Sequence, residues 1–186
     1  MKTASIVLRS AIAVCFAFVM SSASCDLFDK VDDVNIAVVL DHTFNVNETA
    51  PGTDVEYTLK QVLDAADVSD EFDKYKTKIK SVTVTGVTYK ITNCDGQVVF
   101  TDGVVVFSAV TASTSSKVAE LGVEDLKAAE NQVKNLTYDQ AAVDELANLI
   151  KTDQKVNLYL TGTLSNTPAA FDVTVTVNAS ITANAL

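Results

Sequence analysis

The chain has 186 residues, and its 24 Asp and Glu against 14 Lys and Arg give a formal net charge of −10. Cationic side chains that neutralise phosphates dominate nucleic-acid affinity, so a chain this acidic is not expected to bind nucleic acid. It contains one histidine, His42, and six scattered glycines, so it has no glycine-rich phosphate loop, and a catalytic centre of the Ser-His-Asp or Cys-His type would have to use His42.

The first 25 residues carry the pattern of an export signal. Lys2 and Arg9 are basic, and the apolar run over 11–20 is too short to span a bilayer. The small residues Ser22-Ala23-Ser24 then lead to Cys25. This segment resembles a bacterial lipoprotein signal, with Ser22 in the position where that pattern prefers leucine. The resemblance implies that Cys25 receives the lipid and becomes the mature N-terminus.

This resemblance divides the chain into three parts. We expect a signal peptide over 1–24, a lipidated cysteine with an acidic tether over 25–33, and a single β-sandwich domain over 34–186. The expected location is the cell envelope, where the lipid on Cys25 holds the protein at a membrane, the outer membrane in a Gram-negative cell. The only predicted contact with the membrane is this anchor, because an acidic surface is repelled by anionic lipids.

Cys94 is the cysteine that remains in the body of the chain. With Cys25 lipidated, Cys94 would be a free thiol in an export compartment, which is tolerable when the thiol is buried. If an ordinary signal peptidase cuts after Ala23 or Ser24 instead, Cys25 and Cys94 could form one disulfide. The sequence leaves both outcomes open.

The first half of the body alternates between apolar and polar residues, as strands do. This period of two predicts a strand over 34–46, a turn over 47–52 and a second strand over 55–59. A further alternating segment over 82–91 slips by one residue at Thr85-Gly86. One extra residue at a glycine predicts a β-bulge.

The next strands are separated by clear turn signals. Asn93-Cys94-Asp95-Gly96 predicts a hairpin turn, because Asp-Gly suits the positive φ values of tight turns. We expect the returning strand over 97–108 and a Ser/Thr-rich loop over 111–117. Two more strands over 156–164 and 171–183 close the chain, and the last has the clearest alternation of all, with threonine prominent on its polar face.

Three segments have a helical pattern instead. Ser69 can cap a short helix, with acidic residues at its start and lysines at its end. The apolar stripe of that helix would consist of Phe72, Tyr75 and Ile79. A second helix is expected over 123–133 and a third, more strongly amphipathic, over 139–151.

Six or seven alternating strands joined by short turns predict a mainly β fold. We expect an antiparallel β-sandwich, of which the immunoglobulin arrangement is one form, with one to three short helical insertions. The sequence contains no internal repeat and no sign of a second domain.

Four aspartates are the candidates for a calcium site. They recur every three residues and are Asp64, Asp67, Asp70 and Asp73. On a helix this spacing would gather carboxylates on one side, where a hard cation such as calcium binds. However, the loop spacing and central glycine of an EF-hand are absent, and helix capping with a solvated face explains the same residues. We therefore expect no metal and no cofactor.

His42 is the other residue that could carry chemistry. Its phase in the alternating strand places it on the apolar face, so we expect a structural role. Carboxylate pairs of the kind that hydrolyse glycosides are not excluded by residue types alone, but the chain has no tryptophan to form a sugar platform. A non-enzymatic protein is the prediction.

The body over 34–186 resembles small bacterial lipoproteins of unknown function that end in a Thr/Val strand. We predict a cell-envelope lipoprotein that acts as a binding, adhesion or scaffold module for an unknown protein or glycan partner. One alternative is a pilin-like assembly subunit that exchanges its terminal strand, 171–183. Another is a carrier of an apolar ligand, held between the sheets or under the helix at 139–151.

Overall fold

The structure, a computed structural model, describes residues 33–111 and 116–184. It is built almost entirely from antiparallel strands, with four short helices in the described part. The elements are β1 (Asp33–Asp64), α3 (Ala65–Val68), α4 (Asp70–Tyr75), β2 (Ile79–Asp95), β3 (Val99–Ala109), β4 (Ser116–Asp125), α5 (Leu126–Ala129), β5 (Val133–Asn135), β6 (Thr137–Tyr138), α6 (Gln140–Thr152) and β7 (Lys155–Asn184). The prediction of a mainly β antiparallel sandwich with short helices is confirmed.

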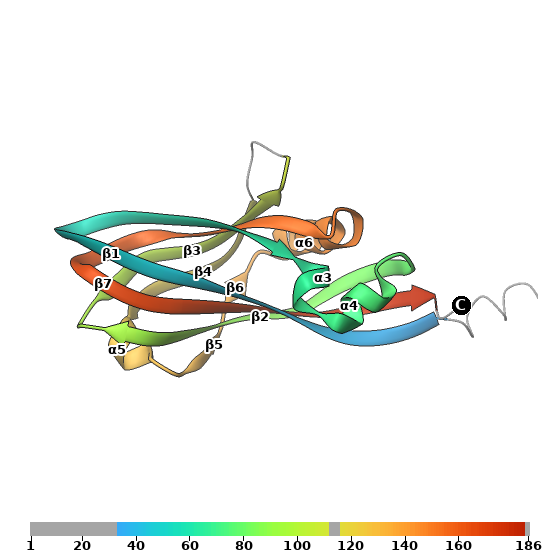
Figure 1. Cartoon of the computed structure of the whole chain (residues 1–186), viewed down its shortest axis with the longest axis horizontal. Coiled ribbons are helices and arrows are strands. Elements are labelled where there is room, and N and C mark those ends of the chain that lie inside the picture. Colours follow the sequence, from blue (N-terminus) through green and yellow to red (C-terminus); the bar gives the residue numbers. More distant parts are fainter. Residues whose placement is uncertain (1–32, 112–115, 185–186) are drawn as a thin grey trace, which may run out of the picture.

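Two very long strands, β1 and β7, form the frame of the molecule. They pair antiparallel along their whole length, from Asp33 opposite Asn184 to Asp64 opposite Lys155. The register shifts between Glu48 and Gly52, and at this point both strands turn back at the left-hand end of Figure 1. One ribbon thereby supplies two strands to each layer of the sandwich.

The remaining strands extend the two halves of this folded ribbon. In the first layer, which we call layer A, β1 over 33–48 pairs with β7 over 169–184, β2 pairs with the other side of β7, and β5 pairs with β2. In layer B, β1 over 52–64 pairs with β7 over 155–167, followed in order by β3, β4 and β6. In the described chain, β1 is therefore the edge strand of both layers.

The inward-facing side chains of the two layers form one continuous core. Alternate residues of β7 from Ala169 to Ala183 are buried, as the sequence pattern predicts. The bulkiest fully buried side chains are phenylalanines from both layers and from α4. They are Phe44, Phe72, Phe100, Phe107 and Phe171.

The helices cover openings between the layers. α6 begins at the cap Asp139, whose carboxylate accepts a hydrogen bond from the Ala142 N–H at 3.1 Å, and it packs against strands of both layers. α4 begins at Ser69, whose hydroxyl accepts from the Phe72 N–H at 3.2 Å, and Phe72 is fully buried. The predicted cap at Ser69 is confirmed, but Ile79 starts β2 instead of ending a helix.

The predicted helix over 123–133 is wrong. β4 continues to Asp125, a single helical turn follows as α5, and Val133 already belongs to β5. Val123 and Val133, which suggested an apolar stripe, are each 68% exposed. Glu130, which follows Ala129, already has a non-helical ψ of 133°, and Asn131 has a positive φ of 66°. The bulge predicted at Thr85-Gly86 is present, as a register shift between β2 and β7.

A polar contact also joins the layers across their open side. The Lys134 ammonium of β5, in layer A, donates to the Glu124 carboxylate of β4, in layer B, at 2.7 Å. The buried Tyr89 hydroxyl donates to the same carboxylate. Burial and the negative charge of Glu124 raise the pKa of Tyr89 well above its usual range, so its proton stays in place.

Candidate functional site

A recess lies at the end of the sandwich where the β1–β7 ribbon turns back. We call this end the tip; it is made by the bends of β1 and β7 and by the turn between β2 and β3 (Figure 1, left). The recess, the tip pocket, has a volume of about 340 Å³. It is lined by Asn47, Glu48, Thr49, Asp95, Gly96, Pro168, Ala169 and Ala170.

Hydrogen bonds between the two bends hold the tip together. The Thr167 hydroxyl donates to the carbonyl of Ala50 across the ribbon, and the Glu48 carboxylate accepts from the Ala50 N–H at 3.1 Å. Further along layer A, Asp172 accepts from the Asn45 side chain at 2.7 Å and from the Asn93 side chain at 2.6 Å. Three strands are thus tied side by side next to the pocket.

The turn between β2 and β3, which completes the tip, is supported by α5 and the residue that follows it. The N–H of Cys94 donates to the Glu130 carboxylate at 3.0 Å, and the Lys127 ammonium donates both to the Cys94 carbonyl at 3.1 Å and to Glu130 at 2.8 Å. The Cys94 side chain is buried, and its thiol donates to the Gly96 carbonyl at 3.8 Å. Burial and the nearby Glu130 carboxylate raise the pKa of this thiol, which leaves it a poor nucleophile.

The contacts of Glu130 make the stability of the fold depend on pH in the acid range. Hydrogen bonds from Lys127 and from the Cys94 N–H lower the pKa of Glu130 below its ordinary value of 4.5. The folded state therefore holds this proton less tightly than the unfolded state, so Glu130 stabilises the fold above pH 4.5 and loses that effect as the pH falls through its folded pKa. We expect Glu130→Gln to lower the urea midpoint at pH 7, and we expect this deficit to shrink as the pH falls from 4.5 through the folded pKa of Glu130.

The control for this prediction is Glu71→Gln, on the exposed surface of α4. Its urea midpoint should follow that of the wild type at pH 7 and at pH 3. A Glu130→Gln deficit of the same size at pH 7 and at pH 3 would contradict the assigned role of the ionised carboxylate.

The lining of the tip pocket is polar and acidic. It offers two carboxylates, Glu48 and Asp95, together with an amide, a hydroxyl and backbone groups, and it contains no cationic side chain. Such a lining attracts hydrogen-bond donors and positive charge.

His42 lies elsewhere, on the inner side of β1. Its Nε2 is 2.7 Å from the Gln61 side-chain oxygen, which joins the two halves of β1 across the layers, and its ring meets that of Phe44 edge-on at 5.2 Å. The inward position expected from its phase is confirmed, and its contacts are structural.

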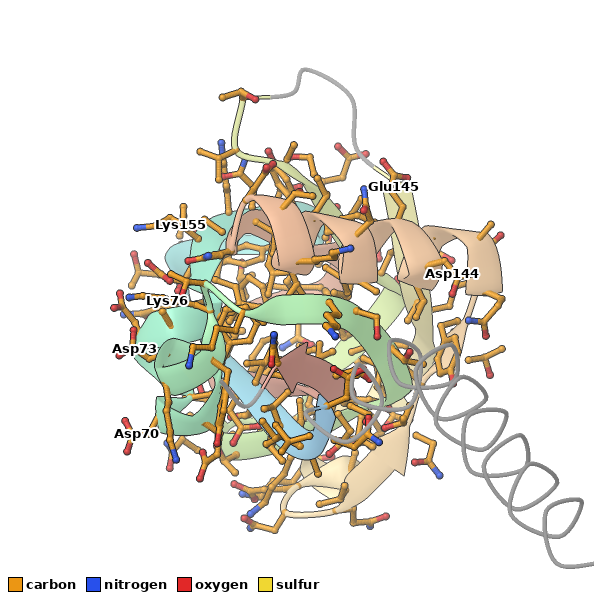
Figure 2. All side chains as sticks on the ribbon, turned by 90° about the vertical axis from the view of Figure 1, so that its right-hand side faces the viewer. Asp70, Asp73, Lys76, Asp144, Glu145 and Lys155 are labelled. Atoms are coloured by element: carbon orange, nitrogen blue, oxygen red, sulfur yellow. The ribbon has the colours of Figure 1, made fainter. Side chains whose placement is uncertain are left out.

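The four calcium candidates lie at the opposite end of the sandwich, which we call the helical end. Asp64 caps α3 and pairs with Lys155 at 2.6 Å, and this contact lowers its pKa. Asp73 pairs with Lys76 at 2.6 Å. Figure 2 looks onto this end and shows Asp70, Asp73 and Lys76 along one side. In the described part of the chain, no three acidic, His or Cys side chains gather as metal ligands would.

The lipidation candidate Cys25 and the predicted signal peptide over 1–24 lie outside the described residues, as does most of the tether over 25–33. Among the helices that the structure describes, none is both long and apolar enough to cross a bilayer.

The position of Cys94 nevertheless decides the disulfide alternative. Cys94 precedes Asp95, which pairs with Ala170 at the tip, whereas Asp33 pairs with Asn184 at the helical end. The fourteen residues of β7 between those two points span about 45 Å at about 3.3 Å per residue. Eight residues separate Cys25 from Asp33, and they reach at most about 29 Å. A bond between Cys25 and Cys94 of one chain is out of reach.

The residues of the tip pocket are not candidates in the sequence. The signals there were turn signals only: Asn47 to Gly52, Asp95-Gly96 and the stretch before Pro168. Each marks a local change of direction. That the three turns meet follows from the pairing of Glu48 with Ala169 and of Asp95 with Ala170, residues far apart in the chain, which local patterns do not contain.

Comparison with known proteins adds no family. No protein-family model matches the chain, and no curated protein matches it. Among solved structures, it is similar to the decameric capsid protein of BFDV, with 8% identity, a TM-score of 0.37 and coverage of 80% of this chain and 98% of that chain. It is also similar to the structures of Desmodium yellow mottle tymovirus (11%, 0.33, 82% and 91%) and turnip yellow mosaic virus (9%, 0.26, 80% and 96%). TM-scores this low carry no argument about fold or function.

Proposed function

We propose that this protein is a lipid-tethered, non-enzymatic binding module of the cell envelope, attached through Cys25 and binding its partner at the tip. The observation that carries the proposal is the placement of the two ends. The described chain begins at Asp33 in the helical end, next to Asn184, and the tip pocket lies at the other end of the sandwich. An anchor that precedes Asp33 would leave the tip pointing away from the membrane.

The lining of the pocket narrows the kind of partner. Carboxylates at Glu48 and Asp95 with the amide of Asn47 favour a partner that presents amines, amides or hydroxyls. An exposed basic segment of an envelope protein and the hydroxyl groups of a glycan both have this chemistry. The rigid frame of hydrogen-bonded bends keeps the pocket formed before the partner arrives, which lowers the cost of ordering on binding.

Replacement of the anchoring cysteine tests the tether. In cells that make the full chain, we expect Cys25→Ser to move the protein from the membrane fraction to the soluble fraction. The intact mass of the wild-type protein should include lipid on the N-terminal peptide that starts at Cys25. The matched control is Cys94→Ser, which also removes one thiol but should stay with the membrane, because Cys94 is buried at the tip.

Two results would remove the proposal. One is a wild-type protein without lipid that is recovered in the soluble fraction. The other is a Cys25→Ser protein that stays in the membrane fraction, since attachment would then come from another part of the chain.

The strand-exchange alternative meets a structural cost. The segment 171–183 pairs with β1 on one side and with β2 on the other, so it is a central strand of layer A. Its release would open the core at residues such as Phe171 and Val173, both buried. No contact of the described residues favours this alternative or the apolar carrier over a binding module.

A further inference from the structure

We infer that the layer B half of β1, residues 52–64, is a docking edge for a second copy of this chain, with the two copies antiparallel about a two-fold axis at Thr58. Because the two copies run antiparallel, the tip of one lies beside the helical end of the other; the inference therefore concerns the chain when it is not held tip-outward on one membrane, and it does not rest on the tip pocket. It starts from the strand order: over the described residues, β1 pairs with β7 alone, so its other side is an edge. A long edge strand presents backbone groups that a further strand can pair with.

The outer side chains of this edge are exposed, as they also are in the layer A half of β1. Every second residue from Asp54 to Val62 is exposed, and Val62 is 49% exposed although it is apolar. On the inner face, Tyr57 and Leu59 are only partly buried against the core. A strand added alongside would cover all of these apolar groups and would pair the free backbone edge at the same time.

Charge selects the partner and the register. In an antiparallel pair centred on Thr58, Glu56 of each copy lies opposite Lys60 of the other, so the two-fold axis produces two opposite-charge pairs. Among the described residues Glu56 has no ion-pair partner, and the Lys60 ammonium rests over the Tyr159 ring at 5.6 Å, at the same face of the sheet. The charges on this edge of one copy are therefore complementary to the charges on the same edge of a second copy.

Neighbouring registers fit less well. Residues that lie opposite each other must be on the same face of the sheet, so the two-fold axis can pass only through a residue and not between two residues. With the axis at Leu59, Asp54 of one copy would lie opposite Asp64 of the other, and Glu56 would lie opposite Val62. A centre at Tyr57 would rely on Asp54, whose φ of 50° takes it out of strand geometry. With the axis at Thr58, Asp54 lies opposite Val62 outside the regular part of the strand, whereas Glu56 and Lys60 both lie within it.

The layer A half of β1 lacks this complementarity. Between residues 33 and 48 its charged side chains are Asp33, Asp41 and Glu48, and all three are acidic. The same segment also contains His42. Asp41 is already bonded to Thr176 and Asp33 to Lys80. Two copies of this half would bring carboxylates together without a cation to offset them. The two halves of one strand thus give a test edge and a matched control edge.

Cysteine cross-linking of the full chain tests the pairing and its register. In Thr58→Cys, the two new thiols would face each other at the axis. Residues opposite each other in an antiparallel pair have Cα atoms about 4.5–5.5 Å apart, which lies within the range of about 4.4–6.8 Å that a disulfide requires. The control is Thr43→Cys, an exposed threonine of the other half that, like Thr58, hydrogen-bonds a threonine of β7.

We expect Thr58→Cys to form several-fold more disulfide-linked dimer than Thr43→Cys on a non-reducing gel, with the unsubstituted chain giving the background from its own cysteines. Within Thr58→Cys, either Glu56→Lys or Lys60→Glu should lower the yield, because each sets like charges opposite each other. The two changes together should restore it. The distant change Glu71→Lys alters the net charge like Glu56→Lys and should leave the yield unchanged.

The inference is overturned if Thr58→Cys links no better than Thr43→Cys, or if the single charge reversals do not lower its yield. Thermal unfolding of each variant shows whether it is folded. If Thr58→Cys does not fold, a mixture of Glu56→Cys and Lys60→Cys chains tests the same register, because those two residues lie opposite each other. Linkage in the mixture above that of either chain alone supports the inference, and its absence refutes it.

Discussion

Phe100→Ala is expected to lower the free energy of unfolding by about 3–5 kcal/mol, the usual cost of emptying a fully buried phenylalanine site. Phe100 lies in β3 with no exposed surface, its ring is 6.1 Å from that of Phe171 of β7, and it lies against Gly103 and Gly162. β3, the layer B half of β7 and the layer A half of β7 therefore meet at one ring. Urea unfolding at 25 °C, with the slope compared between proteins, measures the change.

The control for this prediction is Val133→Ala, a residue of β5 that is 68% exposed. It removes apolar atoms from the surface, so its effect should stay within about 0.5 kcal/mol. A cost for Phe100→Ala below about 1 kcal/mol would mean that the neighbouring strands close over the lost volume, contrary to the rigid packing described above.

Gly162→Ala is the second large effect, expected at about 1–3 kcal/mol because it overfills a packed site. A Cβ at position 162 would lie 2.5 and 2.6 Å from carbons of the Phe100 ring and 3.0 Å from the carbonyl oxygen of Thr101. The ring is fully buried and the carbonyl belongs to the backbone, so neither can move aside at low cost. Urea unfolding again gives the magnitude.

Gly86→Ala is the matched control, since Gly86 is also a strand glycine but a Cβ there meets no atom within 4 Å. Its effect should be close to zero, or slightly stabilising because alanine loses less backbone freedom on folding. In the Phe100→Ala background the cost of Gly162→Ala should fall sharply, since both changes act on one contact. Full additivity of the two costs would contradict the clash with the ring.

The strands were predictable from the sequence wherever one face of the strand is buried and the other is exposed to solvent. In β7 the apolar residues hold even positions near Leu160 and odd positions from Phe171 onward, and β1 switches in the opposite sense between Val46 and Val55. These changes of phase mark the bends. The sequence could not show that the two bends coincide, because this depends on which strands pair, and pairing is a long-range property.

The errors have physical causes of the same kind. In the segment 123–133 the valines at both ends lie on the surface, and the residues that bury are Leu126 and Ala129. One turn of α5 buries both, so a longer helix would gain nothing. The tip pocket was not predictable either: each turn was visible, but Glu48 and Asp95 meet only because β1 and β2 both pair with β7.

The pairing of β1 with β7 also sets when this protein can fold. The last 30 residues of the described chain, β7, supply the partner for β1, β2 and β3 alike. On the ribosome, all three strands emerge long before that partner exists, and contacts between distant parts of a chain form slowly even afterwards. Neither sheet can close before β7 has been made. Until then β1, β2 and β3 lack their shared partner, and the chain can still pass through a narrow channel as an extended polypeptide.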